Sequence, residues 1–176
     1  MNKIIAIMLL SIAGVIVGCD TQSKPTEKIW LFSLGESISQ VKQTLTDNRY
    51  EYKQIDSSIG GFTALVDFLG VKWHGYDLSF NKDELEALHF MIDNISDKES
   101  RLTNYDIDRL VERLDSEYGE NRQDISQRNE EDNLIKWTWV KGNIEILLVT
   151  MFDNELVDLL IYKHGSDFKE RYQMNI

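Results

Sequence analysis

The chain has 176 residues, 42% of them hydrophobic, and a formal net charge of −11 at pH 7. An acidic chain lacks the basic surface that neutralises phosphates, so we expect no nucleic-acid binding and no attraction of the folded part to anionic lipid head groups. The length suits one domain or two small packed halves. The charge favours a basic protein partner, but it is equally consistent with simple solubility of a secreted domain.

The first 18 residues have the pattern of a secretory signal. Lys3 precedes an uncharged apolar run over residues 4–17, which is shorter than the roughly 20 apolar residues that cross a bilayer. The run ends on the sequence IVGC, in which Cys19 is the only cysteine of the chain. One cysteine allows no disulfide within the chain.

The sequence IVGC resembles the bacterial lipobox, in which an aliphatic and two small residues precede an obligatory cysteine. The resemblance implies a diacylglyceryl group on Cys19, cleavage after Gly18, and acylation of the new amino terminus, for example with palmitate. Two acyl chains anchor a protein stably to a membrane. A transmembrane anchor or an ordinary cleaved signal is the alternative.

Residues 19–28 then form a lipidated cysteine and a flexible tether, which contains the only proline, Pro25. Asp20 resembles the signal that keeps lipoproteins of enteric bacteria in the inner membrane, but other bacteria do not follow that rule. We therefore predict an extracytoplasmic, lipid-anchored protein of the bacterial cell envelope, with the choice between inner and outer membrane open.

Residues 29–95 are predicted to form a first unit of one helix followed by antiparallel strands. Ser37 is a helix cap, and Gln40 lies three residues on, as in a capping box. The helix is expected to end at Asp47-Asn48. Strands are expected over residues 50–55, 62–73 with a break at Gly70, 76–80 and 85–92, with turns at Gly60-Gly61 and over residues 81–84.

Residues 96–165 are predicted to form a second unit of the same kind, followed by a tail over residues 166–176. Its helix begins after Thr103 and ends at Gly119. One face of this helix carries apolar residues at helical spacing: Ile107, Leu110, Val111, Leu114 and Tyr118. Strands are expected over residues 122–126, 134–140, 144–152 and 156–163.

The order of elements suggests an internal repeat. Residues 80–90 share their pattern of aromatic, turn and leucine positions with residues 152–162, and Trp73 and Trp139 each precede a hairpin. Any two antiparallel hairpins share part of this pattern. We nevertheless expect an α+β fold of two tandem repeats, each a helix followed by antiparallel strands, with the helices packed on one face of the sheet or sheets.

The segments LGESISQVKQTL (34–45) and VDFLGVKWHGYDLSFNKDELEALHF (66–90) resemble the β-lactamase-inhibitor-protein-like superfamily. That superfamily includes small outer-membrane assembly lipoproteins of the SmpA/OmlA type. The resemblance implies tandem helix-plus-sheet units over most of residues 30–163. The chain departs from it in lacking the cysteines of the disulfides that some members carry, and a shared fold does not transfer function.

Aromatic residues are the candidate contacts for a protein partner. Trp73, His74 and Tyr76 cluster at the end of one predicted strand, and Trp137 and Trp139 share one face of another. Tryptophan and tyrosine are enriched at interface hot spots. The alternative for Trp137 and Trp139 is burial under the helix.

No catalytic or metal-binding pattern stands out. His74, His89 and His164 are not paired at ligand spacing, and residues 129–132 lack the ligand order of a calcium loop. No nucleophile elbow, phosphate loop or dinucleotide fingerprint occurs.

We therefore predict a protein without enzymatic activity, metal or cofactor. Its expected function is a non-catalytic protein-binding module that serves envelope assembly, inhibition or immunity. Two alternatives remain open at this point: an envelope hydrolase that uses paired carboxylates, and a carrier of a small ligand.

Overall fold

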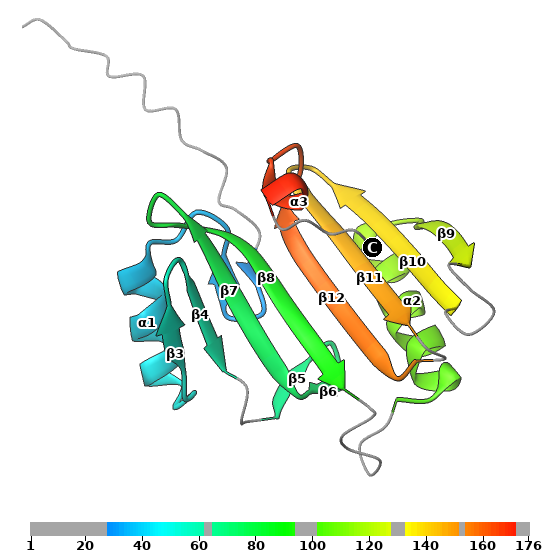
Figure 1. Cartoon of the computed structure of the whole chain (residues 1–176), viewed down its shortest axis with the longest axis horizontal. Coiled ribbons are helices and arrows are strands. Elements are labelled where there is room, and N and C mark those ends of the chain that lie inside the picture. Colours follow the sequence, from blue (N-terminus) through cyan, green and yellow to red (C-terminus); the bar gives the residue numbers. More distant parts are fainter. Residues whose placement is uncertain (1–27, 62–64, 94–101, 128–132, 152–153, 172–176) are drawn as a thin grey trace, which may run out of the picture.

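The computed structural model describes residues 28–61, 65–93, 102–127, 133–151 and 154–171. Figure 1 shows a broad antiparallel sheet of eight strands in the order β3-β4-β7-β8-β12-β11-β10-β9, with two separate two-stranded sheets, β1-β2 and β5-β6. The strands are β1 Lys28–Ile29, β2 Phe32–Ser33, β3 Lys53–Ile55, β4 Ser58–Gly61, β5 Val66–Phe68, β6 Val71–Trp73, β7 Gly75–Asn81, β8 Glu84–Asp93, β9 Arg122–Gln127, β10 Asn133–Lys141, β11 Ile144–Met151 and β12 Leu156–Lys163. The helices are α1 Ile38–Asp47, α2 Asn104–Tyr118 and α3 Phe168–Arg171.

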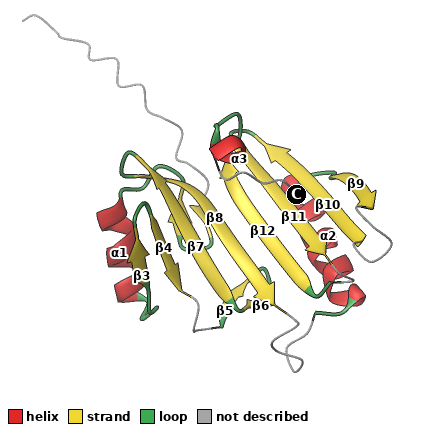
Figure 2. Cartoon of the chain, viewed as in Figure 1, coloured by secondary structure: helices red, strands yellow, loops and turns green. Residues whose placement is uncertain are grey.

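The expected fold class, α+β with two tandem helix-plus-sheet repeats and all helices on one face, is wrong. The described residues are mostly β, as Figure 2 shows, and α3 has only four residues. β8 and β12 pair from Ala87 and Tyr162 to Asp93 and Leu156, so the strands of both halves form one continuous sheet. This pairing satisfies backbone groups that two separate sheets would leave at open edges.

The two halves also differ in content. Within the described residues, the two small sheets belong to the first half alone, and α2 is five residues longer than α1. The third helix lies on the other face of the sheet: Figure 1 shows α2 behind β10 and β11, and α3 in front. The sheet is therefore covered unequally on its two faces, which leaves one face for a site.

The predicted starts of both longer helices are confirmed. Ser37 caps α1 in a capping box with Gln40, and Thr103 caps α2 in a capping box with Asp106. These side chains satisfy backbone N–H groups that the first helical turn leaves without partners. Gly119 ends α2 at a φ of +97°, a conformation that favours glycine.

The inner face of the sheet, covered by α1 and α2, carries the main core. Val41 and Leu45 of α1 and Leu110 and Leu114 of α2 are buried against it. Alternate strand residues complete this core: Leu78, Leu88, Phe90, Trp137, Trp139, Ile146, Leu148, Leu159 and Ile161. Full burial of a large apolar side chain stabilises the fold by about 1.5–3 kcal/mol, so this face supplies most of the hydrophobic stabilisation.

The outer face carries a second, smaller apolar cluster. Its buried residues come from β8, β10, β11, β12 and α3: Ala87, Leu134, Leu147, Val149, Leu160, Tyr162 and Phe168. Phe168 packs against Tyr162 with ring centroids 5.4 Å apart. The helix α3 is thus held on the outer face by an aromatic contact, close to the ends of β11 and β12.

One predicted turn is wrong. Gly60 and Gly61 do not turn the chain but lie in β4, and the turn precedes them at Asp56, where φ is +49°. A Cβ on Gly61 would lie 2.3 Å from Cε1 of Tyr76, so glycine is required there by the close approach of a buried ring.

Candidate functional site

The five residues predicted to contact a partner do not form a surface. Trp73 and Tyr76 are fully buried, and Trp139 and Trp137 are 1% and 8% exposed. His74 is half-buried, and its Nδ1 accepts a hydrogen bond from the backbone N–H of Asp93 at 3.3 Å. This placement corrects the expectation of a partner surface at the aromatic residues. Trp137 and Trp139 are instead buried in the core beside α2, which is the alternative stated for them.

The polar atoms of the buried aromatic residues have partners inside the protein. Nε1–H of Trp139 donates to Oδ1 of Asp115 on α2 at 2.8 Å. The hydroxyl of Tyr76 donates to the carbonyl of Glu51 at 3.1 Å. Hydrogen bonds of this kind remove the cost of burying a polar group, so these residues stabilise the core.

The outer face instead holds a hollow lined by basic side chains, which we call the cationic hollow and define by Arg122, Lys136, His164 and Lys169. Its volume is about 760 Å³, within the range of ligand pockets in proteins. The four residues come from β9, β10, the turn directly after β12, and α3. The lining also includes the carboxylates of Glu120 and Glu145, and Glu145 is ion-paired with Lys169.

The strand alternation that buries the tryptophans builds this hollow. Lys136, Thr138 and Val140 alternate along β10 with Trp137 and Trp139, and therefore point to the outer face. Val140 is 51% exposed in the hollow. The wall on β10 thus offers a cation, a hydroxyl and an exposed apolar group in a row.

Glu145 of β11 anchors the basic side chains at the rim. It is 7% exposed and accepts hydrogen bonds from the hydroxyl of Tyr162 at 2.7 Å, from Nδ1 of His164 at 2.9 Å, and from Nζ of Lys169. Burial raises the pKa of Glu145, but the hydrogen bonds from Lys169, Tyr162 and His164 outweigh burial and hold that pKa below its usual range. The carboxylate is therefore ionised at neutral pH.

The same contacts keep Tyr162 protonated. Burial and the hydrogen bond to Glu145 raise the pKa of the Tyr162 hydroxyl above its ordinary value. Because both oxygens of Glu145 accept hydrogen bonds, the carboxylate is occupied in holding Lys169 and His164 in place. The arrangement positions the Lys169 cation and the His164 ring, and both Glu145 oxygens are already engaged in hydrogen bonds.

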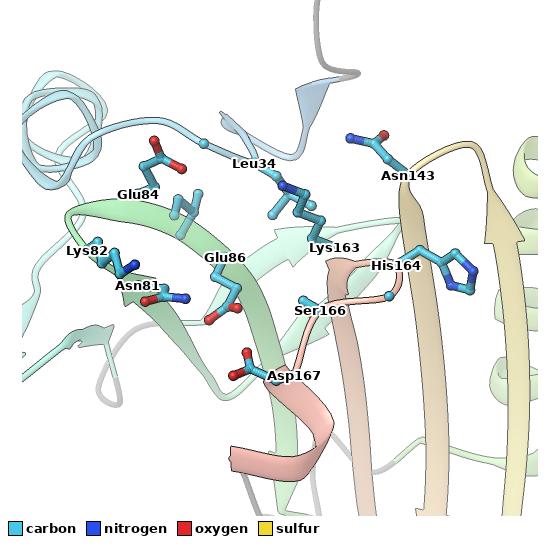
Figure 3. Close-up of a pocket in the computed structure, with 13 residues that line it drawn as sticks. Leu34, Asn81, Lys82, Glu84, Glu86, Asn143, Lys163, His164, Ser166 and Asp167 are labelled. Carbon is cyan, nitrogen blue, oxygen red and sulfur yellow. The ribbon is translucent and has the colours of Figure 1, made fainter.

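A second hollow, which we call the seam hollow, lies where the ends of β8 and β12 separate (Figure 3). It has a volume of about 460 Å³ and shares His164 with the cationic hollow. Figure 3 shows Glu86 and Asp167 approaching one another at one end of it. Arg171 of α3 donates to Asp167 at 3.0 Å and also to Glu86, so one guanidinium is the partner of both carboxylates and the three groups together keep one negative charge.

A further polar pair joins the neighbouring strands β8 and β12 on the outer face. Nε2 of His89 lies 3.0 Å from Oδ1 of Asp158, with side-chain exposures of 18% and 23%. His89 points away from the helix-covered core, as its place between Leu88 and Phe90 predicts. No sequence signal joins His89 and Asp158, which are 69 residues apart.

Among the described residues, no group of three His, Cys, Asp or Glu side chains is placed to hold a metal ion. The acidic segment 129–132, and residues 1–27 with the lipobox resemblance, lie outside the described residues. None of the described helices has the length and apolar character to span a membrane. Comparisons of the chain with known protein families, curated proteins and solved structures found no match.

Sequence reasoning missed the residues of the cationic hollow. Lys136 had a local signal, because it alternates with the tryptophans on one strand. Arg122, His164 and Lys169 had none, since only the strand order β12-β11-β10-β9 and the position of α3 bring them together.

Proposed function

We propose that the protein is a lipid-anchored, extracytoplasmic component of the bacterial cell envelope that acts as a non-catalytic protein-binding module. The anchor is the lipid on Cys19. A fully extended segment from Cys19 to Lys28 spans about 30 Å, so the sheet stays close to the membrane surface. Envelope assembly, inhibition of an enzyme and immunity to a toxin are the roles that fit such a module.

The observation that carries the proposal is the cationic hollow beside the half-exposed Val140 on the outer face. Protein interfaces combine apolar contacts with a charged or polar rim, and this surface offers both. The anchoring of Lys169 and His164 by Glu145 supports binding, because pre-positioned side chains lose little entropy when a partner docks.

The engaged carboxylates favour binding over hydrolysis. The oxygens of Glu145 accept three hydrogen bonds, one of them from Lys169. Arg171 contacts both Glu86 and Asp167. The buried acids near the two hollows, Glu145 and Glu86, therefore already have cationic partners. A glycoside hydrolase of the two-carboxylate type needs one ionised carboxylate as base or nucleophile and one protonated acid. Transport of a small ligand is the second candidate, favoured by the volume of about 760 Å³ of the cationic hollow.

The anchor is tested by mass spectrometry of the full-length chain from a bacterial membrane fraction. We expect a diacylglyceryl group on Cys19 as the first residue, and we expect Cys19→Ser to leave the membrane fraction. An unmodified Cys19 with residues 1–18 still attached would contradict the anchor.

Binding is tested by photo-crosslinking. A photoreactive residue at Thr138 in the cationic hollow is compared with one at Glu112, which is exposed on α2 on the other face. We expect Thr138 to capture one envelope protein in stoichiometric amount and Glu112 to capture none. Equal capture from both positions, or capture from neither, would argue against a partner on the outer face.

A further inference from the structure

The outer face of the sheet buries apolar side chains that need more cover than the described elements supply. Leu147, Val149 and Leu160 are 7%, 0% and 2% exposed, and they belong to the outer apolar cluster. Among the described residues, every member of that cluster lies in a strand except Phe168 of α3. A sheet with one uncovered face leaves the side chains on that face in contact with water, so the burial of Val149 requires a further segment above it.

The helix α3 cannot supply this cover, because it is short and lies at one end of the strands. Lys169 binds Glu145, and Phe168 packs on Tyr162, which is paired with Glu145 on the neighbouring strand. Val149 lies four residues further along β11, a distance of about 13 Å. The four residues of α3 rise only about 6 Å. Val149 is therefore beyond the reach of this helix.

The segment that directly follows α3 has the pattern of a cover for such a surface. Residues 172–176 have the sequence YQMNI, in which apolar and polar side chains alternate strictly. In an extended segment this alternation places Tyr172, Met174 and Ile176 on one side and the two amides on the other. Five extended residues span about 17 Å, which is enough to pass from α3 to Val149. Length, position and alternation therefore all match the uncovered surface.

The other segments outside the described residues fit this surface less well. Residues 128–132 have the sequence RNEED and contain no apolar side chain. Residues 62–64, 94–101 and 152–153 carry one large apolar residue each: Phe62, Ile95 and Phe152. The apolar run over residues 4–17 and a second copy of the chain are the remaining alternative occupants, and crosslinking distinguishes them.

We propose that residues 172–176 lie extended on the outer face of β11 and β12, with the apolar side chains of this segment on Leu147, Val149 and Leu160. Gln173 and Asn175 face the solvent. Monomeric proteins rarely expose large contiguous apolar patches, and the segment removes this one from water. Because Leu147 also lines the cationic hollow, the segment adjoins that hollow. The inference goes beyond the proposed function and does not depend on it.

The alternation supplies a matched pair of variants, studied in the full-length chain in detergent micelles. Met174→Asp/Ile176→Asp places two charges against the apolar surface, whereas Gln173→Asp/Asn175→Asp adds the same charges on the solvent side. We expect the first variant to lower the midpoint of urea unfolding by about 1 M, because two buried apolar side chains are lost. The second is expected to change it by less than about 0.25 M. Equal midpoints of the two variants would overturn the inference.

Photo-crosslinking locates the segment independently of stability. A photoreactive residue at Met174 is compared with one at Gln173, and mass spectrometry identifies the crosslinked peptides. We expect position 174 to crosslink to β11 or β12 of the same molecule, and position 173 to crosslink to neither strand. Crosslinks from position 174 to α1 or α2, or no crosslink within the chain, would contradict the proposed placement.

The reverse crosslink identifies what covers the sheet. Photo-leucine at Leu160 keeps the shape of the side chain and is expected to crosslink to residues 172–176 of the same molecule. A crosslink to residues 4–17 or to residues 128–132 would identify another segment as the cover and refute the inference. A crosslinked dimer would refute it in favour of a second copy of the chain.

Discussion

The hydrogen bond between Tyr162 and Glu145 allows a sharp test of the buried cluster on the outer face. Tyr162→Phe removes only the hydroxyl, which lies 2.7 Å from Oε1 of Glu145, and keeps the ring that is 1% exposed against Phe168. The substitution leaves no cavity of consequence. Its effect therefore reports the hydrogen bond alone.

The magnitude follows from the partners that remain. A hydrogen bond to a charged group contributes about 1.5–3 kcal/mol. Glu145 retains its bonds from His164 and Lys169, so its oxygens do not become unsatisfied and the lower end of that range applies. We expect Tyr162→Phe to lower the free energy of unfolding by about 1.5 kcal/mol.

Urea unfolding followed by circular dichroism measures this change. With a slope of about 2 kcal/mol per molar urea, the midpoint shifts by roughly 0.7 M. Tyr105→Phe is the matched control, because Tyr105 is 67% exposed on α2 and its loss of a hydroxyl should change stability by less than about 0.5 kcal/mol. Equal effects of the two substitutions would refute the stabilising role of the Glu145 cluster.

Three further perturbations test other contacts. Glu145 has a lowered pKa in the folded state, so its ionised form stabilises the fold fully above the unfolded pKa of 4.5. This stabilisation is lost as the pH falls through the folded pKa, so acid should destabilise the wild type more steeply than Glu145→Gln. Thr103→Ala removes the acceptor for the backbone N–H of Asp106 at 3.3 Å and should cost about 1 kcal/mol in urea unfolding. Gly61→Ala places a Cβ 2.3 Å from Cε1 of Tyr76 and should cost about 1–3 kcal/mol, measured as a lower thermal midpoint.

Each of these has a clear contrary result. A Glu145→Gln variant with the same acid profile as the wild type would show that this carboxylate does not contribute to pH dependence. A Thr103→Ala variant of unchanged stability would mean that the capping box of α2 is dispensable. An unchanged midpoint for Gly61→Ala would mean that the ring of Tyr76 moves aside without cost.

The helices could be predicted because their signals are local. Ser37 with Gln40, and Thr103 with an apolar stripe that ends at Gly119, act within one or two helical turns. The strands of the second half were predicted almost at their observed bounds, since alternation and polar breaks mark β10, β11 and β12. Such patterns depend on neighbours in the chain and need no knowledge of the sheet order.

The predictions that failed depend on contacts between distant segments. Gly60-Gly61 has the composition of a turn, but both residues lie in β4, and Gly61 makes room for the ring of Tyr76 on the neighbouring strand. The tandem repeat failed because similar hairpins do not determine whether β8 and β12 pair across the seam. The aromatic surface failed because alternation places Trp137 and Trp139 on a common face without indicating which face the helix covers.

The sequence by itself determined where the helices begin, where most strands lie, and that the chain is acidic with a single cysteine after an apolar start. Those properties follow from local backbone preferences and from composition. Only the tertiary structure decided that the tryptophans are core and that Arg122, Lys136, His164 and Lys169 surround one hollow. Strand order and the docking of α3 by Phe168 are set by burial of apolar surface across the whole molecule, which no short stretch of sequence contains.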